Sequence, residues 1–452
     1  MRNNPYRLLK SEEFGWGIQR ERGVDIYFDG KKVSGFKGDS IASALLGQGI
    51  HLIGRSFKYH RPRGFVSSGV EEPNGLVTVR QGVAEEVNAR ATMTEAVMGI
   101  RATSQNRFPN LRHDLLSVNS TLLAKIFPAG FYYKTFKFPR RFWESLYEPL
   151  IRRAAGLGRV KNMPDPDTYA ERNAFFDVVI VGGGFAGLIT ALNLAPQLAR
   201  QNKTLLLADE DWHFGGYLHQ SPEKIDDKYP MTWVPQAVEK LRSYDNVTLL
   251  PRTTVTALYD HQFLTALERV TDHLLAHQMR HLPRQRFWKI RAKQIVLATG
   301  SLERPLAFPN NDRPGVMLAG ALADYIKRFA VLPARHVVFL TNNDSVYEVA
   351  KMVLLAGRKA TVVDVRPHAK ESEDRFTLIA KVKAMGGRVL EQATIGDVIT
   401  DKCWQKKVKK VTIYGLVASD QPQAGNGMGL MLDTSLRPLV VATELVAMSG
   451  GF

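Results

Sequence analysis

A glycine-rich turn in the middle of the chain has the residue types and the spacing that hold a pyrophosphate. The apolar run Val178 to Val181 is typical of a buried parallel strand, and the glycines follow it directly. In the pattern G-x-G-x-x-G, Gly182 permits a tight turn, Gly184 lets backbone approach the anion, and Gly187 lets the next helix pack close to the strand. The helix N-terminus then faces the phosphates. The predicted contact residues are Gly182, Gly183, Gly184, Phe185, Ala186 and Gly187.

Two later segments have residues that suit the same ligand. The acidic pair Asp209-Glu210 ends a second apolar run, Leu205 to Leu207. It lies roughly 20 residues after the glycines, where a carboxylate can bind a ribose hydroxyl. Gly215 and Gly216 follow shortly afterwards and can bring backbone near a bound pyrophosphate, although a simple turn would explain them almost as well.

A third segment is typical of two-dinucleotide-binding flavoproteins. An apolar strand at Ile290 to Ile295 continues into Ala298, Thr299 and Gly300. Small residues at this point let the chain turn beneath a cofactor. We therefore expect an FAD/NAD(P)-binding, Rossmann-like region, with these three residues close to the ligand.

A second α/β pattern follows, but its turn lacks the glycines. Strands are predicted at His336 to Leu340 and Ala360 to Val363, with a helix at Ser345 to Ala356 between them. The turn reads Thr341-Asn342-Asn343-Asp344-Ser345. Asparagine tolerates left-handed backbone, but close approach to a pyrophosphate needs glycine. We interpret this unit as a degenerate nucleotide-binding domain.

The N-terminal region is predicted to be a small β-grasp module, similar to a 2Fe-2S ferredoxin but without a cluster. Val24 to Phe28 alternates like a strand, and Asp29 to Lys32 is a hairpin turn. A helix is expected at Ile41 to Gln48, and a strand at Leu76 to Val79 ends the module. The loop after the helix contains Ser67-Ser68-Gly69, where a plant-type ferredoxin has cluster cysteines.

The predicted organisation of this α/β chain has four parts. The β-grasp module occupies 1–100, and a basic, aromatic connecting arm occupies 101–170. The glycine-rich dinucleotide-binding domain occupies 171–310, and an inserted, degenerate nucleotide-binding domain occupies 311–452. A closing strand and helix of the first domain should follow the insertion, so we expect either a fragment or a fold that a separate chain completes.

Composition narrows the classes of function. The chain has 452 residues and a net charge of +17 without a nucleic-acid-binding motif, which favours a partner protein or an anionic ligand over nucleic acid. The one cysteine, Cys403, excludes a cysteine-ligated metal cluster in this chain. No apolar run is long enough to span a membrane and no secretory signal is recognised, so we expect a cytoplasmic protein.

Several segments together resemble the α subunit of heterotetrameric sarcosine oxidase. They span most of the chain but match only about the first half of that longer subunit. The segments are RSFKYHRPRG (55–64), EEPNGLVTV (71–79), FPAGFYYKTF (127–136), VVIVGGGFAG (178–187), ATG (298–300), TNNDSVYEVA (341–350) and VAMSGGF (446–452).

The resemblance implies a complex that oxidises sarcosine to glycine, transfers the one-carbon unit to tetrahydrofolate and forms hydrogen peroxide. It implies that this chain binds NAD, with FMN at a subunit interface and FAD in the β subunit, beside smaller γ and δ subunits. Asp209 or Glu210 would then bind the adenosine ribose. No residue resembles a catalytic base or nucleophile, and His60 is interpreted as a structural hydrogen-bonding residue.

Two other interpretations stay open. The glycine-rich fold would hold FAD if the chain belonged to a related amine, opine or proline dehydrogenase complex, because FAD and NAD share the same pyrophosphate and ribose. A non-catalytic truncated scaffold is the other alternative. The substrate amine cannot be read from this chain, because its contacts would lie on a partner.

Overall fold

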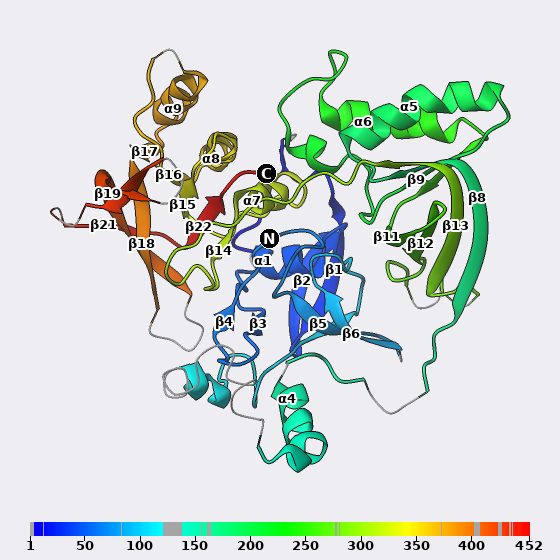
Figure 1. Cartoon of the computed structure of the whole chain (residues 1–452), viewed down its shortest axis with the longest axis horizontal. Coiled ribbons are helices and arrows are strands. Elements are labelled where there is room, and N and C mark those ends of the chain that lie inside the picture. Colours follow the sequence, from blue (N-terminus) through cyan, green and yellow to red (C-terminus); the bar gives the residue numbers. More distant parts are fainter. Residues whose placement is uncertain are drawn as a thin grey trace. The chain divides into compact units, whose positions relative to one another are not determined.

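The computed structural model describes residues 4–11, 13–82, 84–120, 138–154, 156–160, 164–275, 278–279, 281–371, 373–401, 407–423, 427–433, 435 and 437–452. Cys403 and the segment FPAGFYYKTF lie outside these residues. The chain divides into two compact units (Figure 1). The first contains 1–80, 85–162 and 303–452, and the second contains 81–84 and 163–302.

The N-terminal part of the first unit is a five-stranded sheet of order β2-β1-β7-β5-β6. β1 pairs antiparallel with β2 and parallel with β7. The hairpin turn predicted at Asp29 to Lys32 is present but shorter: Asp29 and Gly30 form it, with positive φ angles of 47° and 79° that match the twist of the strands, and Lys31 begins β2. The strands are β1 (Gln19–Phe28), β2 (Lys31–Lys37), β5 (Leu76–Gln81), β6 (Ala84–Arg90) and β7 (Arg101–Ser104), with β3 (Gly54–Arg55) and β4 (Pro62–Arg63) in a separate pair.

This sheet extends further along the chain than the pattern predicted. The predicted last strand, at Leu76 to Val79, is followed by β6 and by β7, which lies between β1 and β5. Alternation alone does not reveal β7, because a four-residue strand is too short to show a period. The predicted helix is present as α1 (Ile41–Gly47), and a capping box between Ser40 and Ser43 begins it.

Short helical segments follow the sheet. They are η1 (Leu115–Ser120), η2 (Arg140–Phe142), η3 (Trp143–Tyr147) and α4 (Glu148–Ala154). The N-terminal part packs on the C-terminal part of the same unit. The Leu318 amide donates to the Val66 carbonyl at 2.7 Å, and the Tyr325 hydroxyl donates to the Ser67 carbonyl at 3.0 Å.

The C-terminal part of the first unit contains a parallel sheet of order β14-β22-β15-β16-β17. Its strands and helices are β14 (Val316–Leu318), α7 (Ala319–Lys327), β15 (His336–Thr341), α8 (Ser345–Leu355), β16 (Lys359–Asp364), α9 (Asp374–Ala384), β17 (Arg388–Glu391) and β22 (Leu445–Ser449). A second, antiparallel sheet contains β18 (Ala393–Thr400), β19 (Val408–Gln423), β20 (Gly427–Leu432) and β21 (Leu439–Ala442).

The apolar run Leu439 to Val446 by itself predicts one further strand, and this prediction is wrong. The apolar run Leu439 to Val446 is not a single strand, since β21 pairs with β19 and β22 pairs with β15. Thr443 separates the two, because its hydroxyl bonds the carbonyls of His336 and Leu445 at 2.9 and 2.8 Å. Side-chain bonds of this kind favour a local turn over a continuous strand.

The second unit is an α/β layer built on a six-stranded sheet of order β10-β9-β8-β13-β12-β11. β8 pairs in parallel with β9 and with β13, and β12 continues the sheet as one strand of a hairpin. The elements are β8 (Tyr169–Val181), α5 (Phe185–Arg200), β9 (Leu205–Ala208), η4 (Gly216–Gln220), α6 (Pro230–Arg242), β10 (Val247–Leu250), β11 (Thr253–Tyr259), β12 (Phe263–Arg269) and β13 (Gln285–Leu297).

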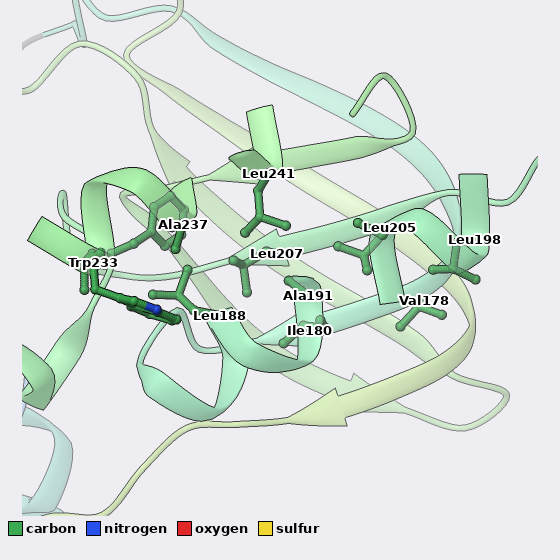
Figure 2. Packing of buried hydrophobic residues seen from close by; sticks show 13 residues of the cluster. Val178, Ile180, Leu188, Ala191, Leu198, Leu205, Leu207, Trp233, Ala237 and Leu241 are labelled. Atoms are coloured by element: carbon green, nitrogen blue, oxygen red, sulfur yellow. The ribbon is translucent and has the colours of Figure 1, made fainter. Parts of the chain in front are cut away.

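An apolar layer between this sheet and its helices holds the site in place. Ile180 and Leu207 point from the strands toward Leu188 on α5 and Leu241 on α6, and Trp233 closes the cluster (Figure 2). Truncating a buried leucine of this kind costs about 2–5 kcal/mol. A separate cluster on the opposite face includes Trp288 and Ile290. The predicted fold class, a ferredoxin-like module followed by a dinucleotide-binding region, is confirmed.

Among the described residues, no helix combines the length and the apolar character needed to cross a membrane.

Candidate dinucleotide site

Gly182 makes the strand-to-helix turn at the end of β8. Its φ of 102° lies in the left-handed region, and a Cβ atom there would collide with the carbonyl oxygen of Ala298. The Gly182 amide donates to the Ala208 carbonyl at 2.8 Å. The turn is therefore joined to the ends of both neighbouring strands, and the predicted residue Ala298 lies directly beside it. Thr299 and Gly300 follow and are exposed.

Gly187 sets the distance between helix α5 and the turn. It is buried in the first turn of the helix, and a Cβ atom would collide with the carbonyl oxygen of Gly182. The next residue, Leu188, is fully buried in the apolar layer. Glycine at 187 thus allows the first turn of α5 to pack directly against the glycine-rich turn.

Gly184 differs from the other two glycines because open space lies beside it. A Cβ atom on Gly184 would have no described atom within 4 Å. It is the N-cap of the 16-residue helix α5, and no side chain caps this end. Phe185 and Ala186 in the first turn are exposed. Uncapped amides at a helix N-terminus, with room in front of them, suit a phosphate anion.

Asp209 holds the glycine-rich turn from the end of β9. Its carboxylate accepts the Gly183 amide at 2.5 Å with one oxygen and the Asp211 amide at 2.8 Å with the other. The structure thus gives the two residues of the acidic pair different surroundings. The side chain of Glu210 is half-buried, and its backbone carbonyl accepts the Arg269 guanidinium at 2.8 Å.

Gly215 and Gly216 lie against the same turn. The Gly215 amide donates to the Gly183 carbonyl at 2.8 Å, and a Cβ atom on Gly216 would lie 3.2 Å from the Gly184 Cα. Both have positive φ angles, 118° and 50°. The pair therefore forms a second wall beside Gly184, and larger residues would narrow the open space.

Two residues near the site were not predicted from the sequence. Phe214 is buried against Gly183, where a Cβ atom would collide with its ring. An aromatic residue before a double glycine was the available signal. Arg269 comes from the hairpin strand β12, distant in sequence, so only the tertiary structure places it beside Glu210.

We predict that Asp209→Ala and Glu210→Ala have different effects, because Asp209 stabilises the glycine-rich turn and Glu210 is the candidate to contact the ligand. Asp209→Ala removes the acceptor of two amides and should lower the free energy of unfolding by about 2 kcal/mol, because bonds to charged groups contribute about 1.5–3 kcal/mol. Glu210→Ala should cost less stability than Asp209→Ala and should weaken dinucleotide binding. Calorimetry on both variants tests this. An unchanged unfolding temperature for Asp209→Ala would contradict the role assigned to its carboxylate.

A buried carboxylate organises the loop of the N-terminal module. Glu72 accepts four backbone amides: Val66 and Ser67 on one oxygen, both at 2.7 Å, and Asn74 and Gly75 on the other, at 2.7 and 3.1 Å. Burial raises the pKa of Glu72 to about 7, although the four amides favour its charged form. No sequence pattern pointed to this role.

His60 lies in the same module and is buried with a positive φ of 53°. Its Nδ1 lies 2.7 Å from an oxygen of the fully buried Asp114, whose other oxygen accepts the Phe108 amide at 3.0 Å. Arg55 is buried nearby and donates to the Leu111 carbonyl at 2.7 Å. These bonds join the basic loop at residues 55–64 to the segment after β7, in agreement with the structural role expected of His60.

The glycine-free turn before α8 is filled by its own side chains. The Ser345 amide donates to the Asn343 side-chain oxygen at 3.1 Å, and the Asn343 side-chain amide donates to the Ser449 carbonyl at 3.1 Å. At the end of β16, Asp364 accepts the Tyr347 hydroxyl at 2.8 Å and the Arg366 guanidinium at 2.7 Å. Side chains of the protein thus bond one another at this turn and at the end of β16.

Comparison with known proteins defines the class. A family model described as pyridine nucleotide-disulphide oxidoreductase matches residues 176–417, and a 2Fe-2S iron-sulfur cluster binding domain model matches residues 21–107. The fold and the glycine-rich site are those of a dinucleotide-binding oxidoreductase. The chain belongs to the pyridine nucleotide-disulphide oxidoreductase family and is a homologue of sarcosine oxidase α subunits.

Two sequence relatives and one solved structure show how far the similarity extends. The sarcosine oxidase subunit alpha of Rhizobium meliloti (strain 1021) is 45% identical over 353 residues, which is 78% of this chain and 35% of that protein. The subunit alpha of Corynebacterium sp. (strain U-96) is 34% identical over 80% of this chain and 33% of its own length. The chain therefore spans about a third of these relatives. The L-proline dehydrogenase of P. horikoshii shares the fold, with a TM-score of 0.56 and 17% identity over 99% of this chain and 62% of that one.

The residues of the first module do not fit a cysteine-ligated cluster. Residues 21–107 contain no cysteine, and thiolates are the usual ligands of a 2Fe-2S centre. Four amides of the corresponding loop converge instead on the Glu72 carboxylate. No step through a cluster is therefore derived for this module.

Proposed function

We propose that this chain is the dinucleotide-binding portion of the α subunit of a sarcosine-oxidase-type complex and that its glycine-rich fold holds NAD. The complex would convert sarcosine to glycine, transfer the one-carbon unit to tetrahydrofolate and form hydrogen peroxide. FAD would lie in a β subunit and FMN at a subunit interface, with γ and δ subunits and a further chain or segment completing the α subunit. The proposal rests on the sarcosine oxidase homology and on the open space at Gly184.

The residues present fit the pyrophosphate of such a cofactor. The uncapped amides of the first turn of α5 and the backbone of Gly184 and Gly216 would bind it, and Glu210 would bind the adenosine ribose. NAD supplies a hydride acceptor when it is bound. The chain's own residues bind and orient the ligand, and we propose no catalytic residue among them. Amine oxidation is therefore placed on a partner chain.

We predict that Gly184→Val abolishes NAD binding while the fold stays intact. A valine side chain would occupy the open space in front of the α5 amides without striking any described atom within 4 Å of its Cβ. The measurement is the cofactor content of the purified chain, by absorbance and mass spectrometry, with calorimetric titration of NAD. We expect NAD binding to weaken by about 100-fold or more, because a loss of about 3 kcal/mol in binding free energy corresponds to a 100-fold change in affinity.

Gly23→Val is the matched control, because a Cβ atom on Gly23 in β1 would also have no described atom within 4 Å, and the φ of Gly23 is not in the left-handed region. Unchanged NAD content in Gly184→Val would overturn the assignment. Release of FAD instead of NAD from the unaltered chain would favour the amine, opine or proline dehydrogenase alternative.

A further inference from the structure

A hollow of about 560 Å³ in the first unit has arginine side chains in its wall. Residues 59, 61 and 63 of the basic loop line it together with residues 310–312 and Ser120. The glycine-rich turn belongs to the second unit. The hollow is therefore separate from the dinucleotide site and needs an explanation of its own.

The carboxylate of Asp312 in this wall is shared by three guanidinium groups. Arg61 binds it with two bonds, from Nε to one oxygen and from Nη2 to the other, both at 2.7 Å. Arg63 Nη1 lies 2.5 Å from one carboxylate oxygen, and Arg313 Nε lies 4.0 Å from the other. Since the bidentate pair with Arg61 already uses both oxygens, one carboxylate serves three positive charges.

A second carboxylate lies near this group but bonds to neutral partners. Asp397 Oδ1 accepts the side-chain amide of Asn310 and the backbone amide of Val398, both at 2.7 Å. Arg313 donates to the side-chain oxygen of Asn310, at 3.2 and 3.3 Å. Among the described residues, three guanidinium groups and two carboxylates therefore leave one positive charge in excess.

The excess charge is partly buried. The side chains of Arg63 and Arg313 are only 24% and 15% exposed. Burial lowers the pKa of both groups, and the positive charge of Arg61 lowers it further. Residues 121–137, which follow Ser120 in the sequence, contain three lysines and no aspartate or glutamate. That stretch of the chain therefore has no carboxylate with which to balance the arginines.

We propose that this hollow binds an oxyanion group of a small molecule, a carboxylate or a phosphate, and that Arg61 and Arg63 contact it. The planar guanidinium fork matches the paired oxygens of either group. The volume of the hollow lies within the range of about 300–1,000 Å³ that is typical of small-molecule sites, so there is room for the organic part of the ligand. The oxyanion would neutralise the positive charge that Asp312 and Asp397 leave in excess.

The test is labelling of the full chain with phenylglyoxal, an arginine-directed reagent, with each modified arginine located by mass spectrometry. The probes are acetate and inorganic phosphate, compared with chloride at equal ionic strength. A probe at about ten times its dissociation constant should slow the modification of Arg63 roughly tenfold, because only the unoccupied site reacts. Protection by acetate would identify a carboxylate ligand, and protection by phosphate at lower concentration would identify a phosphate. Arg388 on β17 is exposed and should react at the same rate throughout.

Two substitutions test the charges with a second readout, the rise in unfolding temperature that the probe causes. Arg63→Gln should weaken binding of the probe by about tenfold or more, because a charged donor is lost. Asp312→Asn should strengthen it several-fold, because it removes the competing negative charge and keeps an acceptor oxygen for Arg61. Gly184→Val should leave binding in the hollow unchanged, because the two sites lie in different units.

The possible results are distinct. Protection of Arg63, with opposite effects of Arg63→Gln and Asp312→Asn on affinity, would support the oxyanion site. Equal labelling of Arg63 in chloride, acetate and phosphate would overturn it, and so would weaker binding in Asp312→Asn, since the ion pairs would then be purely structural. Loss of probe binding in Gly184→Val but not in Arg63→Gln would also overturn it, and would place the anion at the glycine-rich turn with the proposed function still standing.

Discussion

Glu72→Ala is expected to destabilise the chain by about 3–5 kcal/mol, because four backbone amides lose the buried carboxylate that accepts them. The amides of Val66, Ser67, Asn74 and Gly75 come from both sides of the loop, so this one side chain closes it. Water that enters the space would recover part of the loss. The measurement is the free energy of unfolding of the full chain by denaturant at pH 8.

The neighbouring Glu71 is the control for this variant. Glu71 is exposed, so Glu71→Ala removes the same charge and should change stability by less than about 0.5 kcal/mol. Equal effects of the two substitutions would show that charge, and not the set of amide bonds, is responsible.

Glu72 also predicts how stability depends on pH. The pKa of its carboxyl is raised from 4.5 to about 7 in the folded chain, mainly by burial. Between these values the folded state keeps a proton that the unfolded state has released. The part of the stability that is linked to this proton is therefore fully present below about pH 4.5 and is lost as pH rises to 7, by about 3 kcal/mol at 1.36 kcal/mol for each pH unit. The bonds that the carboxylate accepts from the four amides are a separate contribution and remain at pH 8. Glu72→Gln should lack this slope, and a slope equal to that of the unaltered chain would contradict the assignment.

Gly187→Ala is expected to be the other severe substitution, with a loss of about 3 kcal/mol or more and a fall in unfolding temperature of roughly 10 °C. Alanine is the better helix former by about 1 kcal/mol, so propensity alone predicts a gain in stability. Packing instead predicts a loss of stability, because the Cβ atom would collide with the carbonyl oxygen of Gly182 and force α5 away from β8. Displacement of the helix should also weaken NAD binding.

Differential scanning calorimetry of the full chain measures this effect, and Gly184→Ala is its control. Gly184 lies three residues earlier in the same turn, with open space around a Cβ atom and a φ of −73°. The control should therefore unfold within a degree or two of the unaltered chain. A Gly187→Ala variant as stable as the control would show that the close packing of helix and strand is not needed.

The amino-acid sequence by itself determined the elements that carry the dinucleotide site. The apolar run before Gly182 and the helical pattern after Gly187 are local properties, and strand β8 and helix α5 follow from the period of their side chains. The hairpin at Asp29-Gly30 and the cap at Ser40 are local in the same way. The absence of cysteine from residues 21–107 needed no structure either.

Only the tertiary structure decided which residues distant along the chain contact one another. It placed Asp209 beneath the glycine-rich turn and Arg269 beside Glu210, whereas the sequence showed merely two adjacent acids. It also divided the run Leu439 to Val446 between two sheets, and it brought four amides to Glu72. The physical reason is that periodicity reflects only which face of an element is buried. The partner of a carboxylate or a strand depends on long-range packing, which no local pattern encodes.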